Sequence, residues 1–178
     1  TTRPETMLGD TAVAVHPDDE RYAHLHGKHV QHPFLPRRIP IITDAELVDP
    51  EFGTGVVKVT PAHDPNDFAT GKRHDLDEIN ILELDGPLNA EAGPFQGMDR
   101  LHARKAVKER LDALGLARGD KSYPMTLPRC QRCNTIVEPL ISTQWFVEME
   151  PLAKPAIEAV ESGTIQILPE DWKKTYFH

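Results

Sequence analysis

One short segment, GTGVVKVTPAHDPNDF (residues 53–68), concentrates polar groups that could act together on a substrate. It contains a lysine, a threonine two positions later and two aspartates beyond them: Lys58, Thr60, Asp64 and Asp67. If the segment begins as a strand, the lysine and the threonine lie on the same face, because strand side chains alternate. A cation, a hydroxyl and two carboxylates at the end of one strand form a compact site that can bind a substrate ammonium group.

The same residues also have a structural interpretation. Asp64 followed by Pro65 is typical of a helix N-cap and first helical residue. Asp67 would then lie at an exposed helix start, where a carboxylate interacts favourably with the helix dipole. A lone lysine such as Lys58 is usually exposed to solvent, but the set of four favours a substrate site. His63, inside the segment, is the histidine most worth following.

A second polar cluster, TTRPET, occupies residues 1–6. Thr2 and Glu5 fit a capping box, with the threonine at the N-cap and the glutamate three residues later, which predicts a short helical turn. In a functional interpretation, Thr6 or the first amides of this turn hold an anionic or carbonyl group. The two interpretations are compatible.

Two cysteines, Cys130 and Cys133, have the spacing of a metal knuckle. Zinc normally takes four ligands, and no paired histidines lie nearby at a suitable spacing. The pair is therefore either a half-site completed elsewhere or two ordinary thiols, and we expect both cysteines on a surface turn without a complete metal site. A redox role is less favoured, because no βαβ pattern surrounds the motif.

The composition narrows the class of protein. The chain has 178 residues, 39% of them hydrophobic, and a formal net charge of −8. This charge argues against a module that binds nucleic acid through phosphates alone, but not against one that holds a single nucleotide end. Two cysteines favour a cytosolic protein, and no apolar run is long enough to span a membrane. We expect both ends to be internal to a longer protein, because the chain begins without methionine and ends in an aromatic-rich string.

The elements that must position these groups are short and mixed. Strands are expected at 11–17, at two places within 28–43, and at 53–60, 79–84 and 164–169. Helices are expected at 65–74, 100–114 and from 154 to about 163, with shorter turns near 2–5 and 18–27. The order lacks the regular alternation of a doubly wound sheet, so it favours an α+β fold with a mainly antiparallel or barrel-like sheet.

The clearest helix is the one at 100–114. Asp99 can cap its start and Gly115 can end it. Its apolar residues recur at helical spacing and form one stripe: Ala103, Val107, Leu111 and Leu114. We expect Val107 and Leu111 to be buried and Lys108 to be exposed.

Several stretches resemble the editing domain inserted in the class I aminoacyl-tRNA synthetases for valine, isoleucine and leucine. They are TTRPET, residues 53–68, RCQRCNTIVEPLISTQWFVEM and PEDWKKTYFH. The resemblance covers essentially the whole chain, and Lys58 favours the valyl branch, since isoleucyl members usually carry a histidine there. The HIGH and KMSKS signatures of the synthetic site are absent, so amino-acid activation is expected to lie outside these residues.

The resemblance implies a central β-barrel flanked by helices. Residues 1–148 would form the editing domain, and a connecting helix and strand at 149–178 would lead back toward the catalytic domain. The parent enzyme would attach valine to tRNA(Val) using ATP, and its partners here would be the 3′ end of tRNA(Val) and the rest of the synthetase in cis. Editing would need no cofactor, and zinc would have an incomplete site. A cytoplasmic monomer without membrane contact is expected.

The implied activity is hydrolysis of the ester of mischarged threonyl-tRNA(Val). Threonine is nearly isosteric with valine, and a hydrophobic pocket rejects an added hydroxyl poorly; about a hundredfold is the established limit for valyl enzymes. A second site must therefore recognise the hydroxyl and hydrolyse the product.

The resemblance also implies roles for individual residues. Lys58, Thr60 and Asp67 would recognise the threonine hydroxyl, and Asp67, helped by Asp64, would pair with the α-ammonium. Arg3 and Thr6 would hold the terminal adenosine and the ester. Thr6, Asp64 and Asp67 would form the catalytic set, which positions water without an evident general base and with help from the neighbouring ribose hydroxyl.

Two alternatives stay open. One is editing with isoleucyl-type specificity, and the other is a non-catalytic RNA-docking barrel with a zinc half-site. The acidic charge and the lack of interleaved basic and aromatic residues weigh against the docking barrel.

Overall fold

The computed structural model describes residues 1–177, which divide into two compact units, Thr1–Ile141 and Ser142–His178. We describe each unit by itself. Whether these units match the functional division expected at residue 148 stays a prediction. Among the described residues, no helix is both long enough and apolar enough to cross a membrane.

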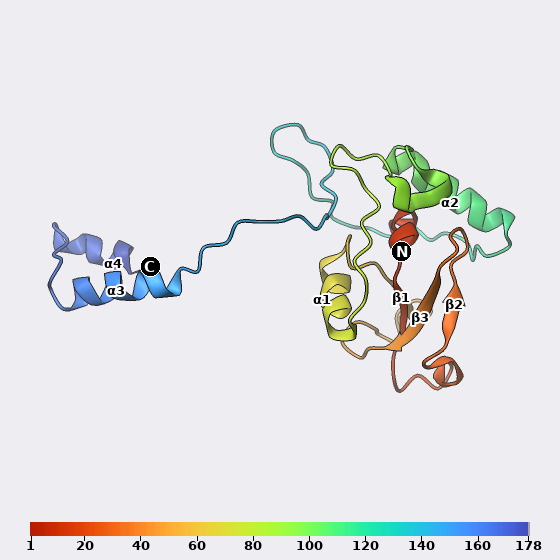
Figure 1. The fold of residues 1–178 in the computed structure, drawn as a ribbon, viewed down its shortest axis with the longest axis horizontal. Helices are drawn as coiled ribbons and strands as arrows, with labels where there is room; N and C mark the ends of the chain where they lie inside the picture. Colours follow the sequence, from red (N-terminus) through yellow and green to blue (C-terminus); the bar gives the residue numbers. More distant parts are fainter. Residues whose placement is uncertain (178) are drawn as a thin grey trace. The chain divides into compact units, whose positions relative to one another are not determined.

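The first unit is built on one four-stranded sheet (Figure 1). The strands are β1 (Ala12–Val15), β2 (His29–Gln31), β3 (Arg38–Thr43) and β4 (Val56–Val59). Their order in the sheet is β2-β3-β1-β4; β1 pairs parallel with β3, and the other two pairings are antiparallel. The predicted α+β class is confirmed. The sheet is open, so the barrel-like description is loose.

The two faces of the sheet differ in chemistry. Val57 and Val59 of β4 lie opposite Ala14 and Ala12 of β1, and this face forms a small apolar cluster with residues such as Val48. On the other face Lys58 lies opposite Val13 in the β1–β4 register. The predicted alternation of β4 therefore presents the lysine on the face away from this cluster.

Helix α1 (Pro65–His74) begins directly after Asp64, inside the segment 53–68, as predicted. The Asp64 side chain caps it, accepting from the backbone N–H groups of Asn66 and Asp67. It ends at Asp75, which has left-handed backbone angles. Gly71 is required by packing, because a Cβ there would lie 2.9 Å from Pro61 Cγ.

A second apolar cluster joins η1 (Pro4–Gly9), η3 (Ala90–Phe95) and α2 (Arg100–Ala113). Figure 1 shows α1 on one side of the sheet and α2 beyond the strand ends, next to η1. Asp99 caps α2, Val107 is fully buried and Lys108 is exposed, as predicted. Leu111 is only partly buried, because the last turns of α2 extend past the cluster.

The predicted capping box is wrong. The N-cap of η1 is Arg3, and it makes no side-chain capping bond. Glu5 instead turns inward, is 2% exposed and accepts two hydrogen bonds from Arg104 of α2. The helical turn itself is present, as the short 3₁₀ element η1.

The strand expected at 79–84 is also absent; only Leu82 bridges, to Leu88. Asn80 accounts for the difference, because its amide donates to Leu82 O while its Oδ1 accepts from Leu82 N. Such local side-chain bonds compete with a strand ladder. The chain at 18–27 forms only the short η2 (Ala23–Leu25).

The second unit is helical in its described residues, with α3 (Glu150–Glu161), η4 (Glu170–Trp172) and α4 (Lys173–Tyr176). Helix α3 begins four residues before the predicted start at Lys154. The strand expected at 164–169 is wrong: Ile165 N donates back to Ala159 O, and residues 142–177 contain no strand that could pair with it.

Candidate functional site

Lys58, Thr60 and Asp10 form a chain of hydrogen bonds at the end of β4. The Lys58 ammonium donates to Thr60 Oγ1, and Thr60 Oγ1 donates to Asp10 Oδ1 at 2.6 Å. Lys58 Nζ lies 3.5 Å from the same Asp10 oxygen. The expected pairing of lysine and threonine on one face is therefore present, but their immediate acidic partner is Asp10.

Asp10 is a residue that the sequence reasoning missed. It follows η1 directly and precedes β1, which places it beside the end of β4 because Thr11 N donates to Val59 O. Asp10 is 3% exposed. Burial raises the pKa of its carboxyl to about 6, and the nearby Lys58 charge opposes this rise. Only the pairing of β1 with β4 reveals this position.

Asp67 is joined to the same cluster. Its Oδ2 accepts from Thr60 N at 2.8 Å, and the residue is only 7% exposed. The expectation of an exposed helix start is thus wrong for Asp67, because the first turn of α1 folds back over the end of β4. Burial raises the pKa of the Asp67 carboxyl.

Asp64 is adjacent to the cluster, but its side-chain oxygens contact other groups. Its Oδ1 caps α1, and its Oδ2 lies 3.6 Å from the Arg3 guanidinium. The structure thus brings Lys58, Thr60 and Asp67 together, while Asp64 joins them only through its bond from Asp67 N.

Arg3 links three segments. It donates to His63 O at 2.8 Å and to Glu138 Oε2 at 3.2 Å, besides its contact with Asp64. Thr6 is buried, and its hydroxyl donates to Arg3 O at 2.9 Å. These bonds give both residues a structural part, and their roles toward a substrate stay predictions.

His63 is held as a neutral ring. Its Nε2 accepts from Ile81 N at 3.0 Å, which leaves Nδ1 to donate to Pro139 O at 3.2 Å. Burial lowers the pKa of His63 to about 4. Near neutral pH the ring therefore holds neighbouring segments together and does not exchange a proton.

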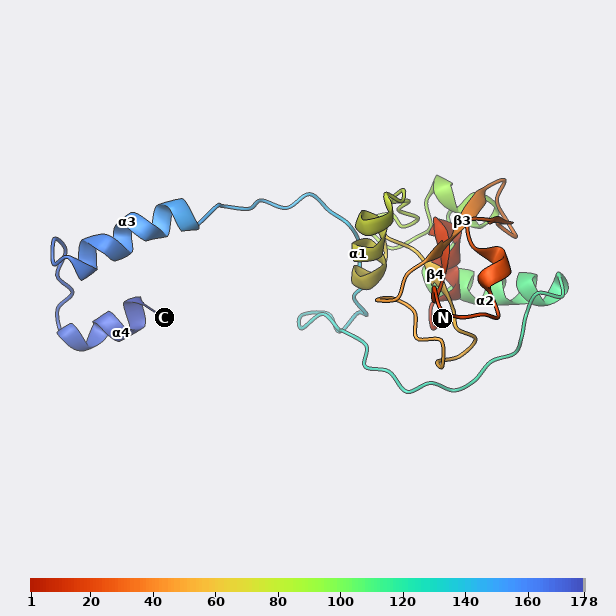
Figure 2. The same cartoon turned by 90° about the horizontal axis from the view of Figure 1, so that it is seen from below.

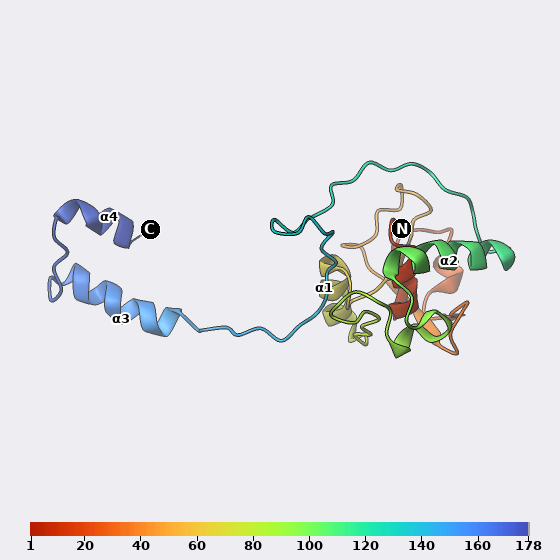
Figure 3. The same ribbon diagram turned by 90° about the horizontal axis from the view of Figure 1, so that it is seen from above.

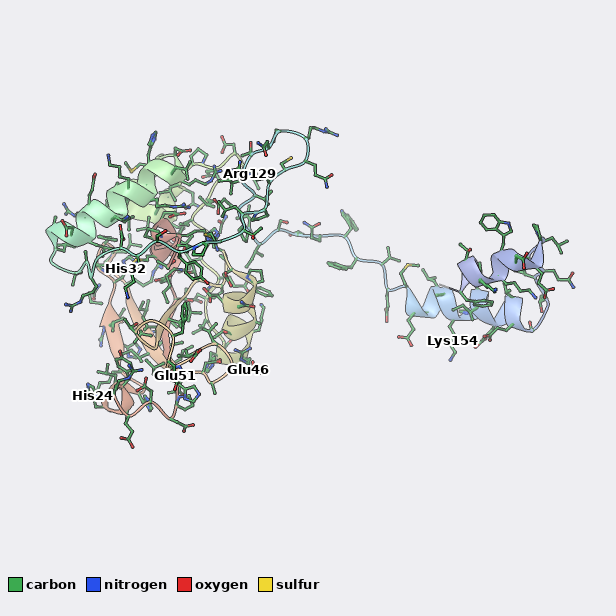
Figure 4. All side chains as sticks on the ribbon, turned by 180° about the vertical axis from the view of Figure 1, so that it is seen from behind. His24, His32, Glu46, Glu51, Arg129 and Lys154 are labelled. Carbon is green, nitrogen blue, oxygen red and sulfur yellow. The ribbon has the colours of Figure 1, made fainter. Side chains whose placement is uncertain are left out.

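A groove of about 1200 Å³ lies over the Lys58 face of the sheet. It is lined by side chains of all four strands, by Asp10, by part of α2, and by residues of the segment 116–125. Figures 2 and 3 show the chain after α2 as an arc that passes outside the N-terminus. His32, labelled in Figure 4, lines the groove near α2. Lys58 and Asp10 line the groove, whereas the described lining includes neither Asp64 nor Asp67.

The cysteines lie on a surface turn, as predicted, which follows Arg129, labelled in Figure 4. Asn134 N donates to Cys130 O to close the turn, and hydrogen bonds, first that with Thr135, lower the pKa of Cys133 to about 7. Within residues 1–177 there is no group of three or more metal-ligating side chains. The pair can supply two thiolates, so a half-site completed elsewhere stays a prediction.

Sequence comparisons place the chain among proteins of one name, although no protein-family model matches it. It is 60% identical over 179 residues to "Valine--tRNA ligase, mitochondrial" of Saccharomyces cerevisiae, 58% identical to "Valine--tRNA ligase" of Solibacter usitatus and 57% identical to that of Clostridium tetani. These matches cover 100%, 99% and 100% of the chain. They cover only 16%, 21% and 20% of the relatives, so the chain spans about a fifth of their length.

The fold is similar to that of a solved structure described as "The crystal structure of GlLeuRS-CP1". The TM-score is 0.52, over 65% of this chain and 79% of that one. At 17% sequence identity, this likeness concerns the fold alone.

Proposed function

The chain belongs by sequence to the valine-tRNA ligase family, as the counterpart of one segment of its members, and we propose that it is the editing segment that hydrolyses threonyl-tRNA(Val). The observation that carries this proposal is the Lys58 ammonium, which lines the groove while Thr60 and Asp10 hold it. The whole enzyme would attach valine to tRNA(Val) with ATP, at a site outside these residues.

The fixed lysine suits a substrate hydroxyl. One Lys58 proton is donated to Thr60 Oγ1 and a second points to Asp10 Oδ1 at 3.5 Å, so the third N–H group is available to a ligand in the groove. A threonyl hydroxyl accepts from the ammonium, whereas the valyl methyl cannot. A substrate that fills the groove would bury this donor, and leaving it then without a partner costs about 1–3 kcal/mol, which is a preference of about five- to a hundredfold.

The two aspartates would bind the substrate ammonium. Asp67 uses Oδ2 for the Thr60 amide, and its other oxygen accepts no hydrogen bond from the described residues. An incoming ammonium would pair with that oxygen and favour the ionised carboxylate. Asp64, one turn away, would add a second negative charge. Thr60 would hold Lys58 through its hydroxyl and Asp67 through its backbone amide.

Hydrolysis itself needs only water and the ester: water adds to the carbonyl carbon, and the ribose oxygen leaves with a proton. We propose that Thr6, Asp64 and Asp67 order this substrate and water, and that Arg3 holds the terminal adenosine side. The neighbouring ribose hydroxyl would assist, since positioning alone can supply a large part of such a barrier. No cofactor enters this step, and zinc at Cys130 and Cys133 would require ligands from elsewhere.

The partners would be the 3′ end of tRNA(Val) and the rest of the synthetase in cis. The second unit exposes Trp145 and Phe146 almost completely. Exposed aromatic side chains of this kind are typical of surfaces that another part of a protein covers. A monomeric state and a cytoplasmic location stay predictions, and one relative is named as mitochondrial.

A deacylation assay on the full-length ligase that carries this chain tests the proposal. We expect threonyl-tRNA(Val) to be hydrolysed at least about tenfold faster than valyl-tRNA(Val). A preference for valyl-tRNA(Ile) instead would indicate isoleucyl-type specificity. Hydrolysis of neither ester above the buffer rate would favour the RNA-docking alternative and refute editing.

A further inference from the structure

We propose that Asp10 is the positioning residue of this site, which fixes the direction of the Lys58 ammonium through the Thr60 hydroxyl and so sets the discrimination between threonyl and valyl esters. This inference rests on the proposed editing function and deepens it. Asp10 lines the same groove as Lys58, at the point where η1 meets β1.

The chemistry of the three groups allows the hydrogen bonds only one direction. The ammonium of Lys58 can only donate, and an ionised carboxylate can only accept. The Thr60 hydroxyl between them must therefore accept from Lys58 and donate to Asp10, as it does in the structure. Without the Asp10 acceptor, the Thr60 hydroxyl could rotate and would no longer present a lone pair to the ammonium.

Asp10 is the rigid end of this chain and Lys58 the flexible end. The Asp10 backbone is held at both polar atoms: its N–H donates to Met7 O at 2.9 Å, and its carbonyl accepts from Arg37 Nη1 at 3.0 Å. Its side chain is almost fully buried. Lys58, in contrast, has four rotatable side-chain bonds and reaches the groove surface, so its direction depends on the groups that hold it.

The charges around Asp10 make the arrangement sensitive to pH. Lys58 faces it from β4, Asp67 from the start of α1, and Arg37 binds its carbonyl from the chain before β3. Burial raises the pKa of Asp10 to about 6. Below that pH the neutral carboxyl can both donate and accept, so the direction of the Thr60 hydroxyl is no longer enforced.

The decisive variant is Asp10→Asn, which keeps the size and an accepting oxygen but removes the charge. In the full-length ligase, we expect the ratio of threonyl to valyl deacylation to fall by about tenfold, a change typical of losing one charge-assisted contact. The wild-type ratio should also fall as the pH drops through 6, and the Asp10→Asn ratio should not. Asp19→Asn is the matched control, since Asp19 is a buried carboxylate that bonds Arg21 instead.

A double-mutant cycle separates positioning from general stability. In a Lys58→Met background, Asp10→Asn should change the ratio by less than about twofold, because the group it positions is gone. Two results would overturn the inference while leaving the editing function intact. One is that Asp10→Asn lowers the ratio equally in the wild-type and Lys58→Met backgrounds, and the other is that Asp10→Asn leaves the ratio unchanged.

A failure of the editing function itself would look different, because wild-type enzyme would hydrolyse neither ester. The positioning of Lys58 is then read directly in the ¹⁵N resonance of its ammonium in the 178-residue chain. The coupling of Asp10 to Lys58 is supported if that resonance shifts in Asp10→Asn and if, in the wild type, it changes with a midpoint near pH 6. An unmoved resonance overturns it.

Discussion

The backbone N–H of Thr60 donates to Asp67 Oδ2 at 2.8 Å, which ties the end of β4 to the first turn of α1. Asp64 completes the junction, because it caps the helix through the amide of Asp67. The turn that carries the candidate substrate-binding carboxylates therefore also stabilises the contact between β4 and α1. An experiment on this turn must therefore distinguish a loss of stability from a loss of substrate binding.

Asp67→Asn makes this separation, because the amide oxygen can still accept from Thr60 N. We expect deacylation of threonyl-tRNA(Val) to fall by about ten- to a hundredfold, since a charge-assisted contact is worth about 1.5–3 kcal/mol. The melting temperature should stay equal or rise, because burial already disfavours the ionised Asp67 carboxyl. Kinetics and calorimetry on the same preparation measure both.

Asp67→Ala is the companion variant, and it removes the hydrogen bond as well as the charge. It should lose activity and also melt at a lower temperature than Asp67→Asn. Folded Asp67→Ala enzyme that edits like the wild type would show that Asp67 does not contact the substrate.

Lys58→Ala should change specificity more than stability. Lys58 is partly exposed in the groove, so its removal leaves no large cavity. We expect threonyl-ester hydrolysis to drop by at least about tenfold, while slow valyl-ester hydrolysis changes little or rises. Rates on both esters measure this. Lys105→Ala, at an exposed lysine of α2, is the control and should leave the ratio of threonyl to valyl deacylation unchanged. An equal loss of activity on both esters in Lys58→Ala would contradict hydroxyl recognition.

The parts that the sequence predicts well are those with local signals. The starts of α1 and α2 follow from Asp64 and Asp99, whose side chains cap the amides two and three residues later. The side of β4 that carries Lys58 follows from simple alternation. In each case the deciding contacts lie within a few residues along the chain.

The parts that it predicts poorly depend on distant contacts. The local pattern predicts a capping box for Glu5, but its partner Arg104 lies 99 residues away. Asp10 reaches Thr60 only because β1 pairs with β4, a sequence separation of 50 residues. No local pattern of residue types encodes such a meeting, so the central acid of the candidate site was not identified.

The Glu5–Arg104 ion pair gives a test of the second apolar cluster. Arg104→Leu leaves the buried Glu5 carboxylate without its partner, which costs about 3–5 kcal/mol in a fully buried pair and less here, because the Arg104 side chain is 31% exposed. The double variant Glu5→Leu/Arg104→Leu should regain much of that loss. Urea unfolding of the three proteins decides it; an additive loss in the double variant would mean that the pair does not act as a unit.

The pH dependence of stability should reveal Asp10 and His63 as opposing groups. The folded pKa of His63 is about 4 against an ordinary 6.5, so its contribution is present above pH 6.5 and is lost as the pH falls toward 4. The folded pKa of Asp10 is about 6 against 3.8, so the folded protein gains stability as the pH falls through the same range. In the wild type the two effects largely cancel.

Asp10→Asn should remove this cancellation. Between pH 6 and 4 the free energy of unfolding of the variant should then fall by about 1 kcal/mol per pH unit more than that of the wild type. In the wild type, the proton that the folded chain binds at Asp10 offsets the proton that the unfolded chain binds at His63, and the variant lacks this offset. Near pH 7 the variant should be at least as stable as the wild type, since the cost of a buried charge is gone. Urea unfolding at pH 7, 6 and 5 measures the difference, with Asp19→Asn as the control whose profile should follow the wild type. Parallel profiles for wild type and Asp10→Asn would mean that the Asp10 carboxyl does not titrate in this range, and its charge would then be the same at pH 5 as at pH 7.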